Sequence, residues 1–167
     1  MANKNFGFSL IELVVVVVIM SVLLSIAIPN LIKYIKKYRI ESEINTLYAN
    51  MVEQRFQSMK SGVPHGVVFD STSKYTLFEF EDKNYNLVFD GIDEERGKKS
   101  VDIPYPFNSD VVGKVVMFDS AGIARKEDWG LCSLTIYVNS PAGYNCIAIS
   151  ASRIKMGVWD GSNCKIK

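Results

Sequence analysis

Residues Gly7–Pro29 have the sequence GFSLIELVVVVVIMSVLLSIAIP, and this stretch decides the fold of the chain. Between its two ends the polar residues are Ser9, Glu12, Ser21 and Ser25. A helix rises about 1.5 Å per residue, so a helix of this length spans the roughly 30 Å hydrocarbon core of a bilayer. We therefore expect residues 8–29 to form a transmembrane or fibre-core helix that carries the rest of the chain.

Glu12 is the feature that an ordinary transmembrane helix would not contain. An unpaired charge at the centre of a bilayer costs at least about 2.5 to 3.5 kcal/mol. In an apolar medium the cheapest partner of this carboxylate is a positive charge. The alternative is a glutamate that reaches out to water from the membrane edge.

Gly7, Phe8, the SLIEL after them, the valine-rich run and the later AIPN resemble the amino-terminal motif of type IV pilins and type II secretion pseudopilins. The resemblance implies that prepilin peptidase removes residues 1–7, cutting between Gly7 and Phe8, and that Phe8 is then N-methylated. It also implies that Glu12 pairs with the methylated amine of the previous subunit and sets the axial register. Pro29 lies where this family kinks or melts its helix.

The same resemblance implies the partners and the location of the protein. Expected partners are other pilin or pseudopilin subunits, prepilin peptidase, the inner-membrane assembly platform and the lipid bilayer. The protein is expected to cross the inner membrane once, with its head in the periplasm, and to enter a pilus or pseudopilus on assembly. The positive-inside rule opposes this orientation, because Lys4 precedes the span and Lys33, Lys36, Lys37 and Arg39 come after it. The cleavage motif and the cysteines favour the external head.

A secretory signal peptide is the rival interpretation of the same stretch. The apolar run is longer than the 7 to 15 residues typical of a signal peptide's apolar region. The segment after Ile28 is polar, has helical spacing and lacks a convincing small-residue cleavage site. Both observations favour a retained helix.

The chain beyond the stem is long enough for one domain. At 167 residues and a net charge of +1, it allows a stem plus roughly 100 residues of head, and it gives no global signal for nucleic acid or an anionic membrane. Residues 30–61 have helical spacing of apolar residues and end at Gly62 and Pro64, so we expect one helix from about Phe8 to Met59. The apolar positions expected to face a sheet are Tyr34, Ile40, Ile44, Leu47, Met51, Val52, Phe56 and Met59. A coiled coil is the lesser alternative for this stripe, because it has fewer than four clean heptads.

Residues 62–167 have the two-residue period of strands. HGVVFD, KYTLFEFED and YNLVFD predict an antiparallel meander, in which Tyr75 and Leu77 lie on one face and Phe78 and Phe80 on the other. Asp90–Lys99 is expected to be a charged loop, and IPYPF an extended edge segment. VVGKVVMFD, LCSLTIYVN and YNCIAIS predict three more strands, with NSPAG as a hairpin loop, and the terminal segment predicts one strand and a tail. The expected fold is α+β and pilin-like, with a long N-terminal helix packed on antiparallel sheet.

The C-terminal half has a looser resemblance to the GspH/FimT group of minor pilins and pseudopilins. It is carried by the FDSAG turn and the final ISASRIKMG segment. That group often has a glycine, Arg, apolar, Arg pattern on its terminal strand, where this chain has Ser152, Arg153, Ile154 and Lys155. Arg153 and Lys155 are therefore the candidate DNA contacts. Ser152 stands in place of the glycine and Lys155 in place of the second arginine, and both replacements weaken the case for DNA binding.

The three cysteines favour one disulfide and one free or buried thiol on an exported head. Spacing alone leaves all three pairings open. We favour Cys146 with Cys164, because this link would tie a core strand to a terminus that otherwise frays. We expect no metal site and no cofactor, since His65 is the sole histidine and is expected to lie in a loop, and no cysteines have paired metal-ligand spacing.

The sequence contains no phosphate-binding glycine loop, nucleophile elbow or HExxH motif, so we expect no enzyme activity. Two classes of function remain. The first is a structural minor pilin or pseudopilin at or near the tip of a type IV pilus or a type II secretion pseudopilus. The alternative is a DNA-binding minor pilin acting in DNA uptake, with Lys165 and Lys167 adding to the basic strand.

Overall fold

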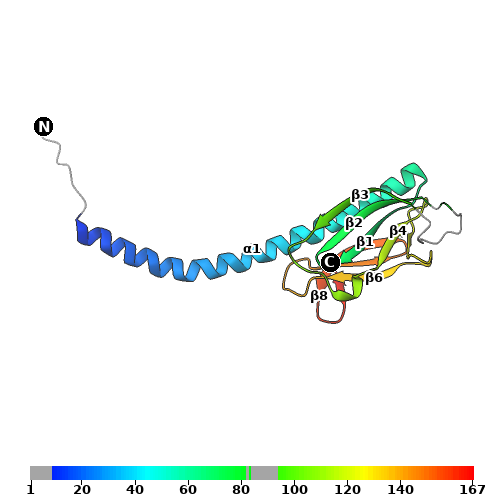
Figure 1. The fold of residues 1–167 in the computed structure, drawn as a ribbon. Helices are drawn as coiled ribbons and strands as arrows, with labels where there is room; N and C mark the ends of the chain where they lie inside the picture. Colours follow the sequence, from blue (N-terminus) through cyan, green and yellow to red (C-terminus); the bar gives the residue numbers. More distant parts are fainter. Residues whose placement is uncertain (1–8, 82, 84–93) are drawn as a thin grey trace, which may run out of the picture. The chain divides into compact units, whose positions relative to one another are not determined.

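The structure is a computed structural model that describes residues 9–81, 83 and 94–167. The chain divides into two units, a stem up to Lys36 and a head from Lys37 onward. One helix, α1 (Leu10–Ser61), contributes to both units, and the described part of the head adds nine strands in two antiparallel sheets (Figure 1). The α+β class predicted from the sequence is confirmed.

The helix ends where the sequence predicted. Gly62 has a φ of 74°, in the left-handed region that favours glycine, and its N–H donates to the Ser58 carbonyl at 3.0 Å. Pro64 comes next, before the first strand. These two residues stop α1 and turn the chain into the sheet.

The first sheet has five strands in the order β3-β2-β1-β4-β5. Its strands are β1 (His65–Ser71), β2 (Lys74–Glu81), β3 (Glu94–Asp102), β4 (Val115–Phe118) and β5 (Ala124–Arg125). A short 3-10 turn, η1 (Ser109–Val111), precedes β4. The two-residue strand β5 was not predicted, and His65 begins β1 instead of lying in a loop.

The second sheet has four strands in the order β6-β7-β8-β9. They are β6 (Ser133–Tyr137), β7 (Cys146–Ser150), β8 (Arg153–Trp159) and β9 (Cys164–Ile166). The loop between β6 and β7 contains the predicted NSPAG segment. The prediction of a plain C-terminal tail was wrong, because residues 164–166 pair with β8.

The main core of the head draws on α1 and both sheets. The helix buries Ile40, Ile44, Leu47 and Met51, which recur at steps of four and three and so lie on one face. They meet Val67, Phe69, Tyr75 and Leu77 of the first sheet and Ile136, Ile147 and Ile149 of the second. Val52, Phe56 and Met59 were expected to extend this stripe, but the structure leaves them exposed, because they lie on another side of the helix. Tyr34, in the stem, is exposed as well.

The other face of the first sheet has its own apolar cluster, made of Phe78, Phe80, Val115 and Met117. The alternation predicted for β2 is therefore confirmed, since Tyr75 and Leu77 belong to the main core and Phe78 and Phe80 to this second cluster.

Two predictions for the middle of the chain were wrong. Residues 94–99 were expected in a charged loop but belong to β3. This edge strand pairs its backbone with β2, and residues 96–99 are exposed to solvent. The expected YNLVFD strand and residues 90–93 lie outside the described residues. The IPYPF segment was expected at a sheet edge, but residues 103–108, which the structure describes, run outside both sheets. The N–H groups of Ile103 and Phe107 donate to carbonyls of the β1–β2 turn at 2.9 and 2.8 Å. Both side chains are buried.

Candidate functional site

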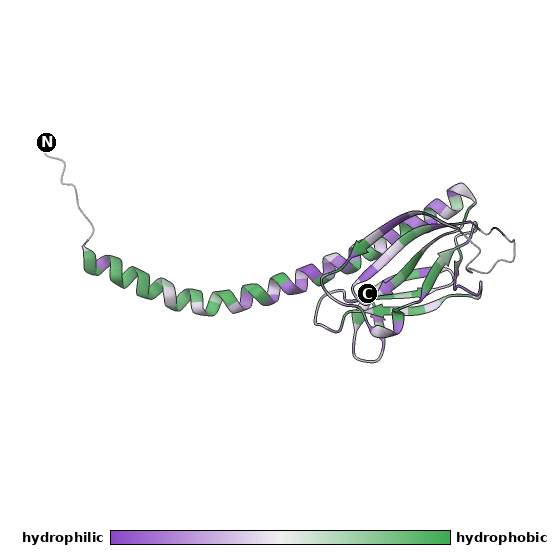
Figure 2. Cartoon of the chain, viewed as in Figure 1, coloured by the Kyte–Doolittle hydropathy of each residue, from purple (hydrophilic) through white to green (hydrophobic). Residues whose placement is uncertain are grey.

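The stem is the first candidate site, because none of its apolar side chains is covered by the part of the chain that the structure describes. Among the described residues, one helix, Leu10–Ser61, is long and apolar enough to cross a membrane, judged by length and composition. None of its most apolar window is buried inside the protein. In Figure 2 the ribbon of the N-terminal half of α1 is mostly green, the colour of hydrophobic residues. Such a surface needs lipid or other protein around it.

The polar side chains inside the stem are satisfied by the helix itself. The hydroxyls of Ser21 and Ser25 each donate to the carbonyl three residues earlier at 2.7 Å, and the Asn30 amide donates to the Ile26 carbonyl at 3.2 Å. The helix is continuous through Pro29. The kink expected at Pro29 stays a prediction.

Glu12 lies in the first turn of α1 and is exposed. Its N–H donates to the Ser9 carbonyl at 3.1 Å, which closes the first turn. The positive end of the helix dipole favours a carboxylate at this position, by about 0.3 to 1 kcal/mol at an exposed site. Gly7 and Phe8, the predicted cleavage and methylation residues, lie outside the described residues, so the pairing of Glu12 with a terminal amine stays a prediction.

The second candidate site is the basic end of the chain, on β8 and β9. Arg153 and Lys155 are both exposed and share a face of β8 by the two-residue period. The other two predicted cations are engaged within the head. Lys165 pairs with Asp160 at 3.1 Å, and the Lys167 ammonium donates to the Gly143 carbonyl at 3.2 Å while lying 5.6 Å from the centre of the Tyr144 ring.

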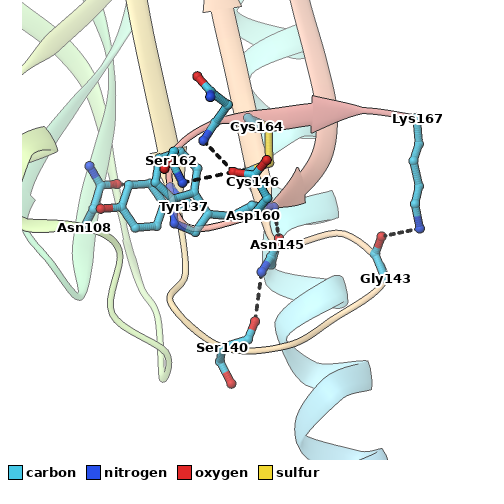
Figure 3. Close-up of a disulfide and its surroundings, with 12 residues drawn as sticks. Asn108, Tyr137, Ser140, Gly143, Asn145, Cys146, Asp160, Ser162, Cys164 and Lys167 are labelled. Carbon is cyan, nitrogen blue, oxygen red and sulfur yellow. Dashed lines mark hydrogen bonds between the residues drawn. A yellow bond between two sulfur atoms is a disulfide. The ribbon is translucent and has the colours of Figure 1, made fainter.

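A disulfide joins Cys146 of β7 to Cys164 of β9, close to these residues (Figure 3). The two strands are not neighbours, because β8 runs between them, and Gly157 pairs with Cys146 across the ladder. A Cβ atom on Gly157 would lie 2.2 Å from the Lys165 carbonyl oxygen and 3.1 Å from the Cys164 sulfur. Gly157 thus leaves the space in which the bridge crosses β8.

Asn145 is a buried residue that sequence reasoning missed. Its side-chain oxygen accepts from the Trp159 N–H at 2.7 Å, and its amide donates to the Ser140 carbonyl at 2.9 Å. Beside it, the Trp159 and Tyr137 rings stack at 3.8 Å. The asparagine thereby holds the β6–β7 loop against β8. The one feature of the sequence that could have drawn attention to Asn145 is its position directly before Cys146.

The turn before β9 is held by Asp160. Its carboxylate accepts from the N–H groups of Ser162 and Asn163 at 3.0 and 2.8 Å. The pKa of the Asp160 carboxyl is lowered to about 2. The largest cause is the backbone hydrogen bond from Asn163, followed by the one from Ser162 and by Lys165. This turn therefore stays charged and ordered at ordinary pH.

Cys132 and His65 are the remaining titratable candidates. Cys132 is buried and free, and burial raises the pKa of its thiol to about 11, so the reactive thiolate is suppressed. Burial also lowers the pKa of His65, whose ring nitrogen lies 3.3 Å from the Ser61 hydroxyl. In the part of the chain that the structure describes, no three His, Cys, Asp or Glu side chains gather into a metal-binding group.

Comparison with known proteins found one match, and it covers most of the apolar part of the stem. Residues 2–28 match the family model described as the prokaryotic N-terminal methylation motif. Searches of curated proteins and of solved structures found no match. The motif supports a type IV pilin-like or pseudopilin-like subunit, which is a structural class of protein processed by prepilin peptidase and assembled with other pilin subunits. Together with the apolar helix, it fits a membrane-anchored protein.

Proposed function

We propose that this chain is a minor pilin or minor pseudopilin, a structural subunit that enters a type IV pilus or type II secretion pseudopilus through its stem and lies at or near the tip. One observation carries the proposal: the methylation motif coincides with an apolar stem that the described residues leave uncovered and that bears a single carboxylate, Glu12. The assignment to a minor subunit depends on the resemblance of the C-terminal half to the GspH/FimT group.

The features that carry this second resemblance are ordered parts of the head. In the FDSAG turn, the Asp119 carboxylate accepts from the N–H groups of Ala121 and Ile123 at 3.0 and 2.9 Å and pairs with Arg125 at 3.0 Å. The segment ISASRIKMG contains the β7–β8 turn and most of β8. Both support a head of this group.

Processing of the amino terminus tests the proposal directly. We expect mass spectrometry of the protein extracted from membranes to find a chain that begins at Phe8 and carries one added methyl group on its amine. The mass should fall by that of residues 1–7 and rise by that of one CH₂ group, because a methyl replaces a hydrogen. An intact Met1, or a terminus created after Ala27, would show that the chain is not processed as a pilin.

The alternative function is DNA binding during uptake. It is favoured by Arg153 and Lys155, which are exposed on one face of β8. Lys165 and Lys167 are engaged within the head, so DNA binding on this strand would depend on two cations, Arg153 and Lys155. A DNA titration of the wild type beside the variant Arg153→Ala, Lys155→Ala decides between the two functions.

A further inference from the structure

The β6–β7 loop and the β8–β9 turn border a common hollow in the head, which we call the loop hollow. Its volume of about 400 Å³ lies within the range of small-molecule sites, roughly 300 to 1,000 Å³. The loop forms one wall, and the end of β8 with its turn forms the other. The lining includes Asn139 and Ser140 of the loop, Trp159 at the end of β8, and Asp160 of the turn.

The two walls of the loop hollow are held together before any ligand binds. The buried Asn145 donates to the Ser140 carbonyl at 2.9 Å in one wall and accepts from the Trp159 N–H at 2.7 Å in the other. Figure 3 shows the bond to Ser140 near the Cys146–Cys164 disulfide. A site that is already ordered loses little conformational freedom when a ligand enters, so more of the contact energy contributes to affinity.

Trp159 gives the loop hollow an apolar surface. Its ring is half-buried, and the Tyr137 ring stacks on it at 3.8 Å and 4°, which holds the indole in one orientation. Within the described residues, the indole N–H has no hydrogen-bond partner. An aromatic ring with an unused donor matches a ligand that offers both an apolar face and an acceptor.

Uncharged polar side chains belong to the other wall. The amide of Asn139 and the hydroxyl of Ser140 have no hydrogen-bond partner in the part of the chain that the structure describes, and both groups can donate and accept. Asp160 is the one charged side chain of the described lining, and it already accepts from its own turn and pairs with Lys165 at 3.1 Å. The loop hollow therefore offers neutral hydrogen-bonding groups and repels anions.

A sugar ring has the complementary chemistry. A pyranose presents C–H groups on one face, which pack on an aromatic ring, and hydroxyls around its edge, which both donate and accept. A purely apolar ligand would leave the polar groups of the lining unpaired, and an acidic one would meet the Asp160 carboxylate. We propose that the loop hollow binds one ring of a neutral oligosaccharide, with its C–H face on Trp159 and its hydroxyls on Asn139 and Ser140. This binding goes beyond the proposed function and does not require the chain to enter a fibre.

Titration of the full-length protein with neutral trisaccharides tests the proposal. The probes are chitotriose, cellotriose and maltotriose, trigalacturonate is the acidic control, and the detergent is one without a sugar headgroup. We expect isothermal titration calorimetry to find saturable binding of at least one neutral probe, and binding of trigalacturonate that is weaker by about tenfold or more. No binding of any neutral probe, or equal binding of trigalacturonate, would overturn the inference.

Two matched asparagine substitutions locate the site. Asn139 and Asn163 are both exposed, but Asn163 does not line the loop hollow. We expect Asn139→Ala to weaken binding about fivefold, the effect of one lost hydrogen bond. Asn163→Ala should stay within about twofold of wild type, because it keeps the backbone N–H that donates to Asp160. Equal affinities of the two variants, both with the circular dichroism of wild type, would exclude the loop hollow as the site.

Oxidation of the two tryptophans reports contact with the sugar directly. N-bromosuccinimide oxidises accessible indoles, and Trp129, which is half-buried against the Phe78 and Phe80 cluster, is the internal control. We expect a bound sugar to slow the oxidation of Trp159 about fivefold or more, because it covers the ring, and to leave that of Trp129 unchanged. Mass spectrometry of the tryptophan peptides measures both rates. Unchanged oxidation of Trp159 at a saturating sugar concentration would mean that the sugar binds elsewhere, and the inference would fail.

Discussion

Glu12 differs from every other polar side chain of the stem in the kind of partner it needs. Ser21 and Ser25 satisfy their hydroxyls on carbonyls of their own helix, so they can enter an apolar core unaided. The helix dipole favours a carboxylate in the first turn only modestly, and transfer of the carboxylate into an apolar core requires a positive partner. We therefore expect Glu12, unlike the serines, to need a positively charged partner from outside its own helix.

We predict that Glu12→Ala leaves the protein in the membrane, because the stem becomes more apolar, but lowers its recovery in sheared fibres about tenfold or more. Ser21→Ala is the matched control, since it removes a polar group that is satisfied within the helix, and it should assemble normally. Immunoblots of the membrane and fibre fractions measure both. Wild-type recovery of the Glu12→Ala protein would show that the carboxylate has no role in assembly.

Single residues also mark the limit of what the sequence could predict about the head. We favoured the pairing of Cys146 with Cys164 because it would tie the C-terminus to a core strand. The structure joins these two residues. That the bridge crosses β8 at Gly157, with Asn145 buried beside it, depends on which strands are neighbours. Strand order is set by non-local pairing, which the local period of side chains does not contain.

At the scale of elements, long periodic segments were predictable and short or charged ones were not. The end of α1 and the two faces of β2 were predictable from periodicity and from Gly62. β3 was missed because an edge strand needs no apolar side chains once β2 supplies its hydrogen bonds. The exposure of Val52 and Phe56 was missed because a helix with two apolar faces has a spacing that fits either one.

The three-residue strand β9 is the element that depends most on a single link. Among the described strands it pairs with β8 alone, and its disulfide closes a loop with a sequence separation of 18. Closing a loop of that size restricts the unfolded chain enough to stabilise the fold by about 3 kcal/mol in the chain-entropy model. We predict that the double variant Cys146→Ser, Cys164→Ser loses stability of that order in urea unfolding monitored by near-ultraviolet circular dichroism.

A reducing agent provides the control for this prediction. It should lower the stability of the wild type to the level of the double variant and leave the variant unchanged, because the buried Cys132 takes part in no disulfide. Amide hydrogen exchange should rise first in β9 and remain slow in β1. Unchanged urea unfolding of the double variant would mean that pairing with β8 alone holds the C-terminus.

The whole molecule joins two parts that sequence comparison treats very differently. Residues 2–28 match a family model, while searches of curated proteins and of solved structures found no match. The physics of the stem limits which residues it can contain, since an apolar helix with one carboxylate leaves few choices. A head needs only an apolar core of the right period and volume, which many sequences supply. The methylation motif of the stem could therefore be identified from the sequence, whereas the group to which the head belongs stays a prediction.

DNA binding is a property of the whole charge distribution, and this molecule gives it little support. The net charge is +1, so capture of phosphates at the terminal strand would depend on the local pair of Arg153 and Lys155. Each phosphate contact adds about 0.9 to the slope of log affinity against log salt, so two contacts give a slope of roughly −2 and weak binding. We predict no detectable binding of duplex DNA by the full-length protein in detergent, at low or moderate salt, in a fluorescence-anisotropy titration. The variant Arg153→Ala, Lys155→Ala is the matched control and should behave like wild type. Salt-sensitive binding by wild type that this variant loses would contradict the prediction and make DNA uptake the better account of the head.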